Sequence, residues 1–141
     1  MAGLITGVRA LIFAAFVGIG ALSAAAQEAP DARALIQKQL DAFAKDDAAE
    51  AFGYAAPGIK QLFGSPEIFI AMVQRQYPAV YRHRSAEFGP AKSAGDTVAQ
   101  AVTLVDADNQ VWTALYTLAR QPDGAWLISG CTVLKSGDTS L

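Results

Sequence analysis

The segment 97–134 constrains the fold of this chain most, because it has the residue pattern of three consecutive β-strands. Valine, threonine, leucine, tyrosine and tryptophan dominate it, and β-branched and aromatic residues suit a pleated, half-buried surface. Turn signals at 106–109 and 121–124 divide the segment. The pattern therefore predicts antiparallel strands joined by hairpin-length loops, at 97–105, 110–120 and 125–135.

A further strand is predicted upstream, at 80–88, where the sequence alternates loosely and contains no helix-breaking residue. Its two faces would carry different side chains: Tyr81, His83, Ser85 and Glu87 on one, and Val80, Arg82, Arg84, Ala86 and Phe88 on the other. The glycines and proline of 89–96 predict a turn region between this strand and the next.

Three amphipathic helices are predicted before the strands, at 32–44, from 46 to about 53, and at 66–76. The second begins at Asp46 and Asp47, and Glu50 occupies the capping-box position relative to Asp47. The third begins at Ser65-Pro66-Glu67, which combines an N-cap, a proline at N1 and an acid in the first turn. One apolar turn, ending at Gly64, separates these two helices.

The N-terminal 26 residues have the pattern of a secretory signal peptide, with Arg9 in the n-region and an apolar run at 10–22. A small-residue site predicts cleavage after Ala26, and the run is shorter than the roughly 20 residues that span a bilayer. We therefore expect a periplasmic or secreted domain at 27–135, a flexible tail at 136–141, and no stable membrane anchor after cleavage.

Cleavage would remove Arg9 and leave 10 of the 11 basic residues against 13 acidic ones, a formal charge of −3. A mildly acidic surface of mixed charge has no electrostatic footprint for nucleic acid or anionic lipid, so neither is an expected partner. The sequence also has no phosphate loop, nucleophile elbow or dinucleotide fingerprint, so we expect no cofactor.

The order of the elements, with helices before antiparallel strands, predicts an α+β fold. We expect three N-terminal helices packed on a curved four-stranded antiparallel sheet. The sheet of a small domain twists and curls around such a layer, which leaves a cone whose mouth lies between helices and sheet.

Particular residues of both halves resemble a known family: Asp41-Ala42-Phe43, Asp46-Asp47, Phe52, Ala55-Ala56-Pro57, Ile59, Ser65-Pro66-Glu67, Phe69, Val73, 77–81 and 126–131. The family comprises uncharacterised exported bacterial proteins with a domain of unknown function, and the resemblance covers 32–134. In outline the chain is similar to the nuclear transport factor-like, or cystatin-like, cone fold. That superfamily includes ketosteroid isomerases, scytalone dehydratase-like enzymes, polyketide cyclases and many non-catalytic binding or dimerisation domains. The resemblance implies a cone-shaped, cystatin-like fold and transfers no catalytic residue.

The predicted strand at 80–88 carries the candidate chemistry. If the face with Tyr81 lines the cone, then Tyr81, His83 and Glu87 form a donor and base set. If the opposite face does, Arg82 and Arg84 could hold an anionic ligand. A third reading is an exposed strand whose charges discourage edge pairing.

The other carboxylates are explained as helix caps and turn residues. His83 is the single histidine, and no ligand spacing around it predicts a metal site. Cys131, the single cysteine, reads either as a small buried residue or as a reactive or dimer-forming thiol.

The predicted central strands are apolar on both faces, so the face that does not cover the helices is expected to meet a partner, such as a second copy in a homodimer. The leading hypothesis is an exported, non-catalytic domain that binds a small ligand or a protein partner and self-associates through its sheet. The predicted ligand-binding residues are Tyr81, Arg82, His83, Arg84 and Tyr116. The alternative is a small enzyme of isomerase, dehydratase or cyclase type that uses Tyr81, His83 or Glu87.

Overall fold

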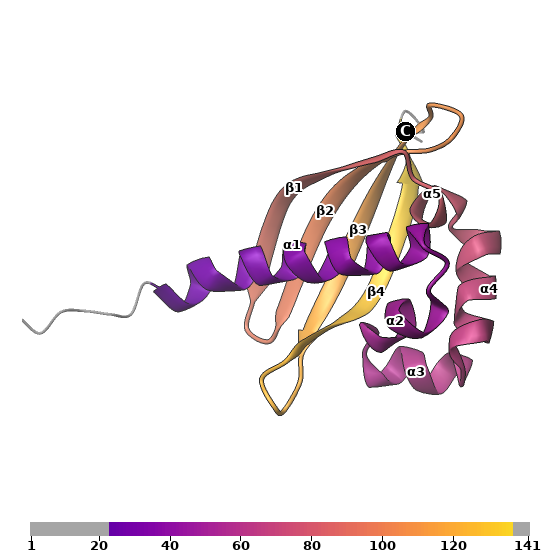
Figure 1. Cartoon of the computed structure of the whole chain (residues 1–141). Coiled ribbons are helices and arrows are strands. Elements are labelled where there is room, and N and C mark those ends of the chain that lie inside the picture. The colour runs from indigo at the N-terminus through magenta and orange to yellow at the C-terminus, as the bar shows by residue number, and fades with distance from the viewer. Residues whose placement is uncertain (1–22, 137–141) are drawn as a thin grey trace, which may run out of the picture.

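The computed structural model describes residues 23–136, and the side chains from residue 32 onward. In this range five helices precede four strands (Figure 1). The elements are α1 (Ser23–Ala44), α2 (Ala48–Gly53), α3 (Pro57–Phe63), α4 (Pro66–Gln76), α5 (Pro78–Tyr81), β1 (Ser85–Ala94), β2 (Thr97–Val105), β3 (Val111–Arg120) and β4 (Trp126–Lys135). The predicted α+β class and the order of helices before strands are confirmed. The number of helices is corrected, from the predicted three to five among the described residues.

The four strands form one open antiparallel sheet in the order β1-β2-β3-β4. Strand β2 has the predicted bounds, and β3 and β4 each begin one residue later than predicted. Alternate residues of β2 and β3 are buried, which is the pattern of a sheet with one face against a core. The loop between these strands is fixed by Asp106, whose Oδ1 accepts hydrogen bonds from the backbone N–H groups of Asp108 and Gln110, both at 2.9 Å.

The predicted strand at 80–88 is wrong in its first half. Residues 78–81 form the helical turn α5, because Pro78 occupies N1, where its fixed φ suits a helix and its missing N–H costs nothing. Strand β1 begins only at Ser85 and continues through the predicted turn at Gly89-Pro90. There the pairing with β2 shifts between Phe88 and Ala91, so these residues form a β-bulge.

A side chain of the neighbouring strand supports this bulge. Gln100 of β2 is buried, and its Nε2 donates to the carbonyl oxygens of Gly89 at 2.8 Å and Ala101 at 2.9 Å. Pro90 is tolerated because β1 is an edge strand, where a missing N–H breaks no ladder. The sequence signal for a turn therefore marks an irregularity inside a strand.

The helical predictions need smaller corrections. Helix α1 contains the predicted helix 32–44 and begins earlier, at Ser23. Asp47 caps α2 by accepting from the N–H of Glu50 at 3.0 Å, as predicted, whereas Asp46 lies outside the helix with φ of +56°. The single apolar turn before Gly64 is the helix α3. Helix α4 has its predicted bounds, and the Ser65 hydroxyl accepts from the N–H of Ile68 at 3.3 Å.

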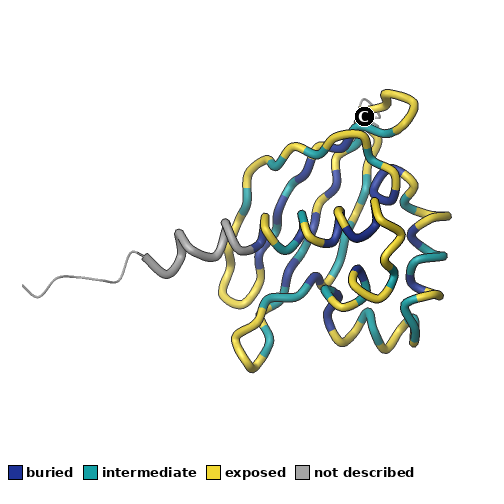
Figure 2. Tube along the Cα trace, viewed as in Figure 1, coloured by how far each residue is buried: buried dark blue, intermediate teal, exposed yellow. Residues whose placement is uncertain are grey.

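The core lies between α1 and the inward face of the sheet (Figures 1 and 2). Helix α1 contributes the buried residues Ile36, Leu40 and Phe43. The sheet contributes Val98, Val102, Leu104, Ala114, Tyr116 and Leu118. Helices α2 to α5 gather beside one end of α1, where the ring of Phe69 lies 6.1 Å from that of Phe43 and 5.4 Å from that of Phe52.

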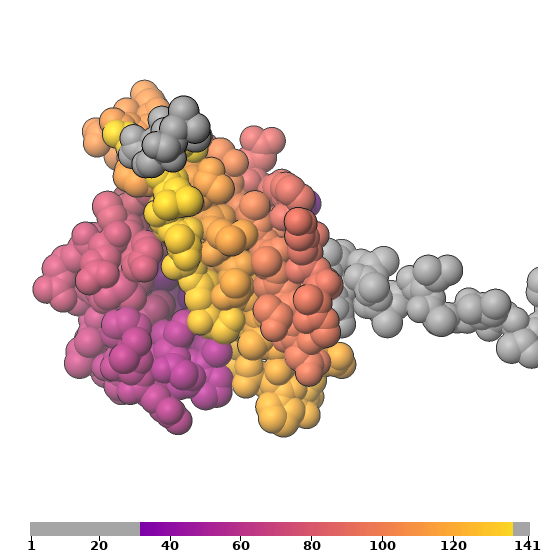
Figure 3. All heavy atoms as spheres, turned by 180° about the vertical axis from the view of Figure 1, so that it is seen from behind, coloured from indigo at the N-terminus to yellow at the C-terminus, as the bar shows by residue number. Residues whose placement is uncertain are grey.

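Among the residues that the structure describes, no helix covers the outward face of the sheet (Figure 3). Most of the predicted signal peptide, and all of the predicted tail beyond Ser136, lie outside the described residues. In the part of the chain that is described, no helix combines the length and the apolar character needed to cross a membrane.

We predict that Gln100→Met destabilises the fold by about 1–3 kcal/mol, because the bulge carbonyl of Gly89 would lose its donor inside the protein. Urea unfolding measures the effect. Gln110→Met makes the same change at an exposed position and should alter the free energy of unfolding by less than about 0.5 kcal/mol. Equal effects of the two substitutions would contradict this role of Gln100.

Candidate functional site

A cavity of about 360 Å³ lies between the helices and the β3–β4 side of the sheet. Fifteen residues line it, from α1, α3, α4, α5, the two strands and the link between α4 and α5: Gln39, Phe43, Ile59, Phe63, Phe69, Met72, Val73, Gln76, Tyr77, Val80, Tyr116, Ile128, Ser129, Gly130 and Cys131. The lining therefore draws on the helical half and on the sheet.

Two backbone features position helix α3 beside this cavity. Gly64 adopts the left-handed conformation (φ +78°) that ends α3 and lets the chain turn into α4. The segment before α3 is tied to β4, since Ala56 N–H donates to the Ile128 carbonyl at 2.8 Å and Ile128 N–H donates to the Tyr54 carbonyl at 2.9 Å. Helix α3 thus starts from a point fixed to the sheet.

A β-bulge in β4 shapes the sheet side of the cavity. Gly130 pairs with Thr117 but Ile128 pairs with Leu118, so Ser129 is the extra residue. The bulge shifts the alternation of the strand, so that Cys131 lies opposite the inward residue Tyr116. Without the extra residue, Gly130 would take the inward position and the cavity would lose the thiol as part of its lining.

The lining is uncharged. It contains no aspartate, glutamate, lysine, arginine or histidine, and phenylalanine, isoleucine, valine and methionine side chains predominate. Polar atoms come from a few positions only. Gln39 donates from Nε2 to the Ala51 carbonyl at 3.1 Å, which leaves its Oε1 as an acceptor.

Tyr116, which is buried, and Cys131, which is half-buried, are the groups of this site whose pKa is raised. Burial, and then the neighbouring thiol of Cys131, hold the pKa of Tyr116 well above its ordinary value of 10. Burial likewise raises the pKa of the Cys131 thiol to about 12, against a smaller opposing effect of the Tyr116 hydroxyl. Both groups stay protonated at neutral pH, so neither has the low pKa of a reactive nucleophile or base. This argues against the reading of Cys131, which is half-buried, as a reactive thiol.

Of the five residues predicted to bind a ligand, Tyr116 lines the cavity and the other four lie outside it. Tyr81 is buried, but its hydroxyl donates to Asp46 Oδ1 and accepts from Gln74 Nε2 at 3.0 Å. Arg82 pairs with Asp46 at 2.6 Å and donates to the Phe43 carbonyl at 3.0 Å. These residues tie the end of α1 to α4 and α5.

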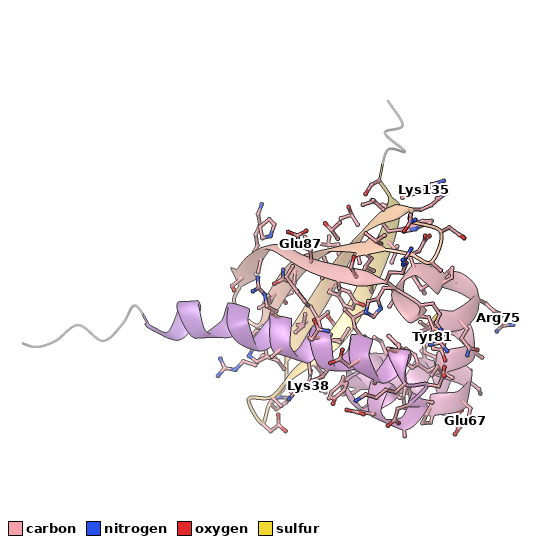
Figure 4. The ribbon with its side chains drawn as sticks, turned by 45° about the horizontal axis from the view of Figure 1, so that its top comes forward. Lys38, Glu67, Arg75, Tyr81, Glu87 and Lys135 are labelled. Carbon is pink, nitrogen blue, oxygen red and sulfur yellow. The ribbon has the colours of Figure 1, made fainter. Side chains whose placement is uncertain are left out.

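The predicted shared face of Tyr81, His83 and Glu87 does not exist, because only Glu87 belongs to a strand. His83 Nδ1 lies 3.1 Å from the Val80 carbonyl oxygen. Glu87 is exposed on β1 and pairs with Thr103 on the outward side of the sheet. Figure 4 shows Tyr81 among the helices and Glu87 far from it. Arg84 donates to Asn109 Oδ1 at 2.6 Å, whereas Arg82 binds Asp46, so the two arginines do not share a partner.

Sequence reasoning missed the role of Asp46, which was explained as a helix cap. Its carboxylate is the shared acceptor for Tyr81 and Arg82, and these two hydrogen bonds, Tyr81 first, lower its pKa from the ordinary value of 3.8. The guanidinium of Arg82 also lies 4.4 Å from the centre of the Tyr81 ring. No local spacing signals this cluster, because Asp46 is 35 and 36 residues from its partners.

Comparison with known proteins gives one finding: residues 25–141 match the model of a protein family, Domain of unknown function (DUF4864). The chain belongs to this family. No curated protein and no solved structure matches it. DUF4864 carries no assigned activity, and among the described residues no group of three or more His, Cys, Asp or Glu side chains is placed to hold a metal ion.

The Asp46 cluster gives a pH-dependent prediction. Because the pKa of Asp46 is lowered in the folded state, its contribution to stability is present above the unfolded pKa, about 3.8, and is lost as the pH falls through the lower folded value. The difference in unfolding free energy between wild type and Asp46→Asn should therefore be largest above the ordinary pKa of 3.8 and should shrink as the pH falls below it. Urea unfolding across this range measures it.

The control is Asp108→Asn, which removes a carboxylate that has neither the Tyr81 nor the Arg82 contact. A stability difference for Asp46→Asn that stays constant on acidification would show that the charge of Asp46 does not contribute.

Proposed function

We propose that this chain is an exported, non-catalytic domain that binds a small, uncharged and mainly apolar molecule in the cavity between its helices and β3–β4. The observation that carries the proposal is the composition of the cavity lining, which is apolar with a few polar atoms and no charged side chain. The cavity volume of about 360 Å³ also falls in the range of roughly 300–1,000 Å³ that is common for small-molecule sites.

The lining argues for an uncharged ligand rather than the anionic one that the arginines suggested. Arg82 and Arg84 are engaged with Asp46 and Asn109 outside the cavity. A charged ligand would lose its hydration and find no counter-ion, which is costly in an apolar site. An apolar molecule instead gains from each part of its surface that leaves water.

The same lining supports a binding role over catalysis. An isomerase or dehydratase of the cone type needs a carboxylate or histidine base inside its cavity. Tyr81, His83 and Glu87 are not among the residues that line this one. Two groups that do line it, Tyr116 with its raised pKa and Cys131 with its pKa of about 12, hold their protons too tightly for that task.

Export rests on the signal-peptide pattern of residues 1–26. We further propose that the fold is a variant of the cone fold that the sequence resembles, since its cavity opens between the helices and one end of an antiparallel sheet.

The outward face of the sheet favours a second property, self-association of two copies. Paired rows across β2, β3 and β4 present uncharged side chains: Ala101, Leu115 and Thr132, then Thr103, Thr113 and Leu134. Leu115 and Leu134 are 46% and 66% exposed. The β2–β4 part of this face can meet its own copy about a two-fold axis without opposing like charges, because the charged Glu87 lies at the edge, on β1. Burial of the exposed leucines would favour such a dimer over the monomer.

The binding proposal predicts that Ile59→Trp, which fills the cavity from α3, weakens binding of the neutral probe 2-acetylnaphthalene at least about tenfold. With about 13 non-hydrogen atoms at about 0.3 kcal/mol each, this probe should bind the wild type with a dissociation constant of roughly 1 mM or below. Changes in protein NMR shifts measure the affinity.

The matched control is Leu62→Trp, on the same helix but 76% exposed and outside the lining. It should bind the probe as the wild type does. Absence of wild-type binding, or equal loss in both variants, would count against the cavity as a ligand site.

Self-association predicts a dimer at roughly 50 micromolar protein, and a monomer for Leu115→Glu, because the substitution would bury a charge at the centre of the interface. Sedimentation velocity distinguishes the two states. Leu62→Glu places the same charge on α3, away from the sheet, and should leave the dimer intact. A wild-type monomer at this concentration would refute the interface.

A further inference from the structure

The hydroxyl of Tyr116 is a buried polar group without a partner. Tyr116 is 1% exposed at the centre of β3, and its Oη forms no hydrogen bond within the described residues. The thiol of Cys131, opposite in the β3–β4 pairing, influences the hydroxyl, but it is a weak hydrogen-bonding group and the contact does not meet hydrogen-bond geometry. A buried hydroxyl left in this state is costly, so it requires an explanation.

Packing alone does not explain it. Phenylalanine would fill the same space and would not carry an unsatisfied oxygen. The other buried polar side chains described have partners, since Gln39 donates to Ala51 and Gln100 donates to Gly89 and Ala101. Tyr116 is the exception among them, and it is a lining residue of the proposed cavity.

The geometry points to Tyr116 as the polar contact of the cavity: its hydroxyl donates a hydrogen bond to an acceptor oxygen, of the carbonyl class, on an uncharged and otherwise apolar ligand. This rests on the proposed function. Tyr116 lines the cavity, but its oxygen has almost no solvent contact. The ligand therefore reaches it after a rotamer change in the lining, for which Cys131, the neighbour of Tyr116, is the nearest candidate.

The electrostatics of the site fit a neutral acceptor. The raised pKa of Tyr116 keeps the hydroxyl protonated and able to donate. No lysine, arginine or histidine lines the cavity, so a carboxylate would gain this single hydrogen bond and no counter-charge. A ketone loses far less hydration than a carboxylate on entering such a site.

Three probes of the same shape test the inference: 2-acetylnaphthalene, 2-isopropylnaphthalene and 2-naphthoate. They present a carbonyl, a methyl group and a carboxylate at the same position. Binding to the purified wild type and to Tyr116→Phe is followed by protein NMR shifts. The wild type should bind the ketone about threefold to tenfold more tightly than the hydrocarbon, and naphthoate most weakly.

In Tyr116→Phe the preference for the ketone should disappear while the affinity for the hydrocarbon stays unchanged. The variant should also unfold at the same or a higher urea concentration, because it loses a hydroxyl that had no partner. This second readout separates a ligand contact from a structural role, since a hydroxyl bonded within the protein would make the variant less stable.

The outcomes distinguish the two proposals. A ketone preference that persists in Tyr116→Phe, or a marked loss of stability in that variant, would overturn the role of Tyr116 and leave the cavity as a binding site. Equal binding of ketone and hydrocarbon by the wild type would likewise overturn the role of Tyr116 and leave the cavity as a binding site. If neither neutral probe perturbs the cavity residues of the wild type, both the proposed function and this inference fail.

Discussion

The fold depends on the burial of α1 against the inward faces of β2 and β3. Ile36, Leu40 and Phe43 of the helix are in one buried cluster with residues such as Val102 and Tyr116 of the sheet. Because side chains of a strand alternate between faces, a shift of one residue in either strand would expose this whole set. The contact therefore fixes the sheet register, and the shorter helices are arranged around the end of α1.

The sequence reveals part of this sheet. Strands β2, β3 and β4 were predicted within one residue, because β-branched and aromatic residues dominate them and turn signals separate them. Strand β1 was not, because Gly89-Pro90 has the local pattern of a turn. The structure has a bulge there instead, and the side-chain amide of Gln100 on the neighbouring strand supports it by donating to the Gly89 carbonyl. A local pattern does not contain a partner that lies 11 residues away in sequence.

The site was predictable only in part, for a similar reason. Tyr116 was a candidate from its place in a central strand, and it does line the cavity. The cavity also depends on the left-handed turn at Gly64 and on the backbone pairing of residues 54–56 with Ile128 of β4, and local residue spacing does not encode either contact. Arg82 and Tyr81 were assigned to opposite faces of a strand. Both in fact contact Asp46, since the segment that carries Tyr81 is helical.

Strand β4 connects the two proposed surfaces. Its bulge at Ser129 places Cys131 on the cavity side, opposite Tyr116, while Ser129 donates to Thr117 Oγ1 at 3.2 Å and Gly130 pairs with Thr117. A Cβ at position 130 would lie 2.9 Å from that same oxygen, so any larger residue would force the Thr117 side chain to move. A ligand that displaces Cys131 therefore acts on the strand whose other face carries Thr132 and Leu134. The two proposed properties therefore share one strand, with the cavity on one face of β4 and the exposed Leu134 on the other.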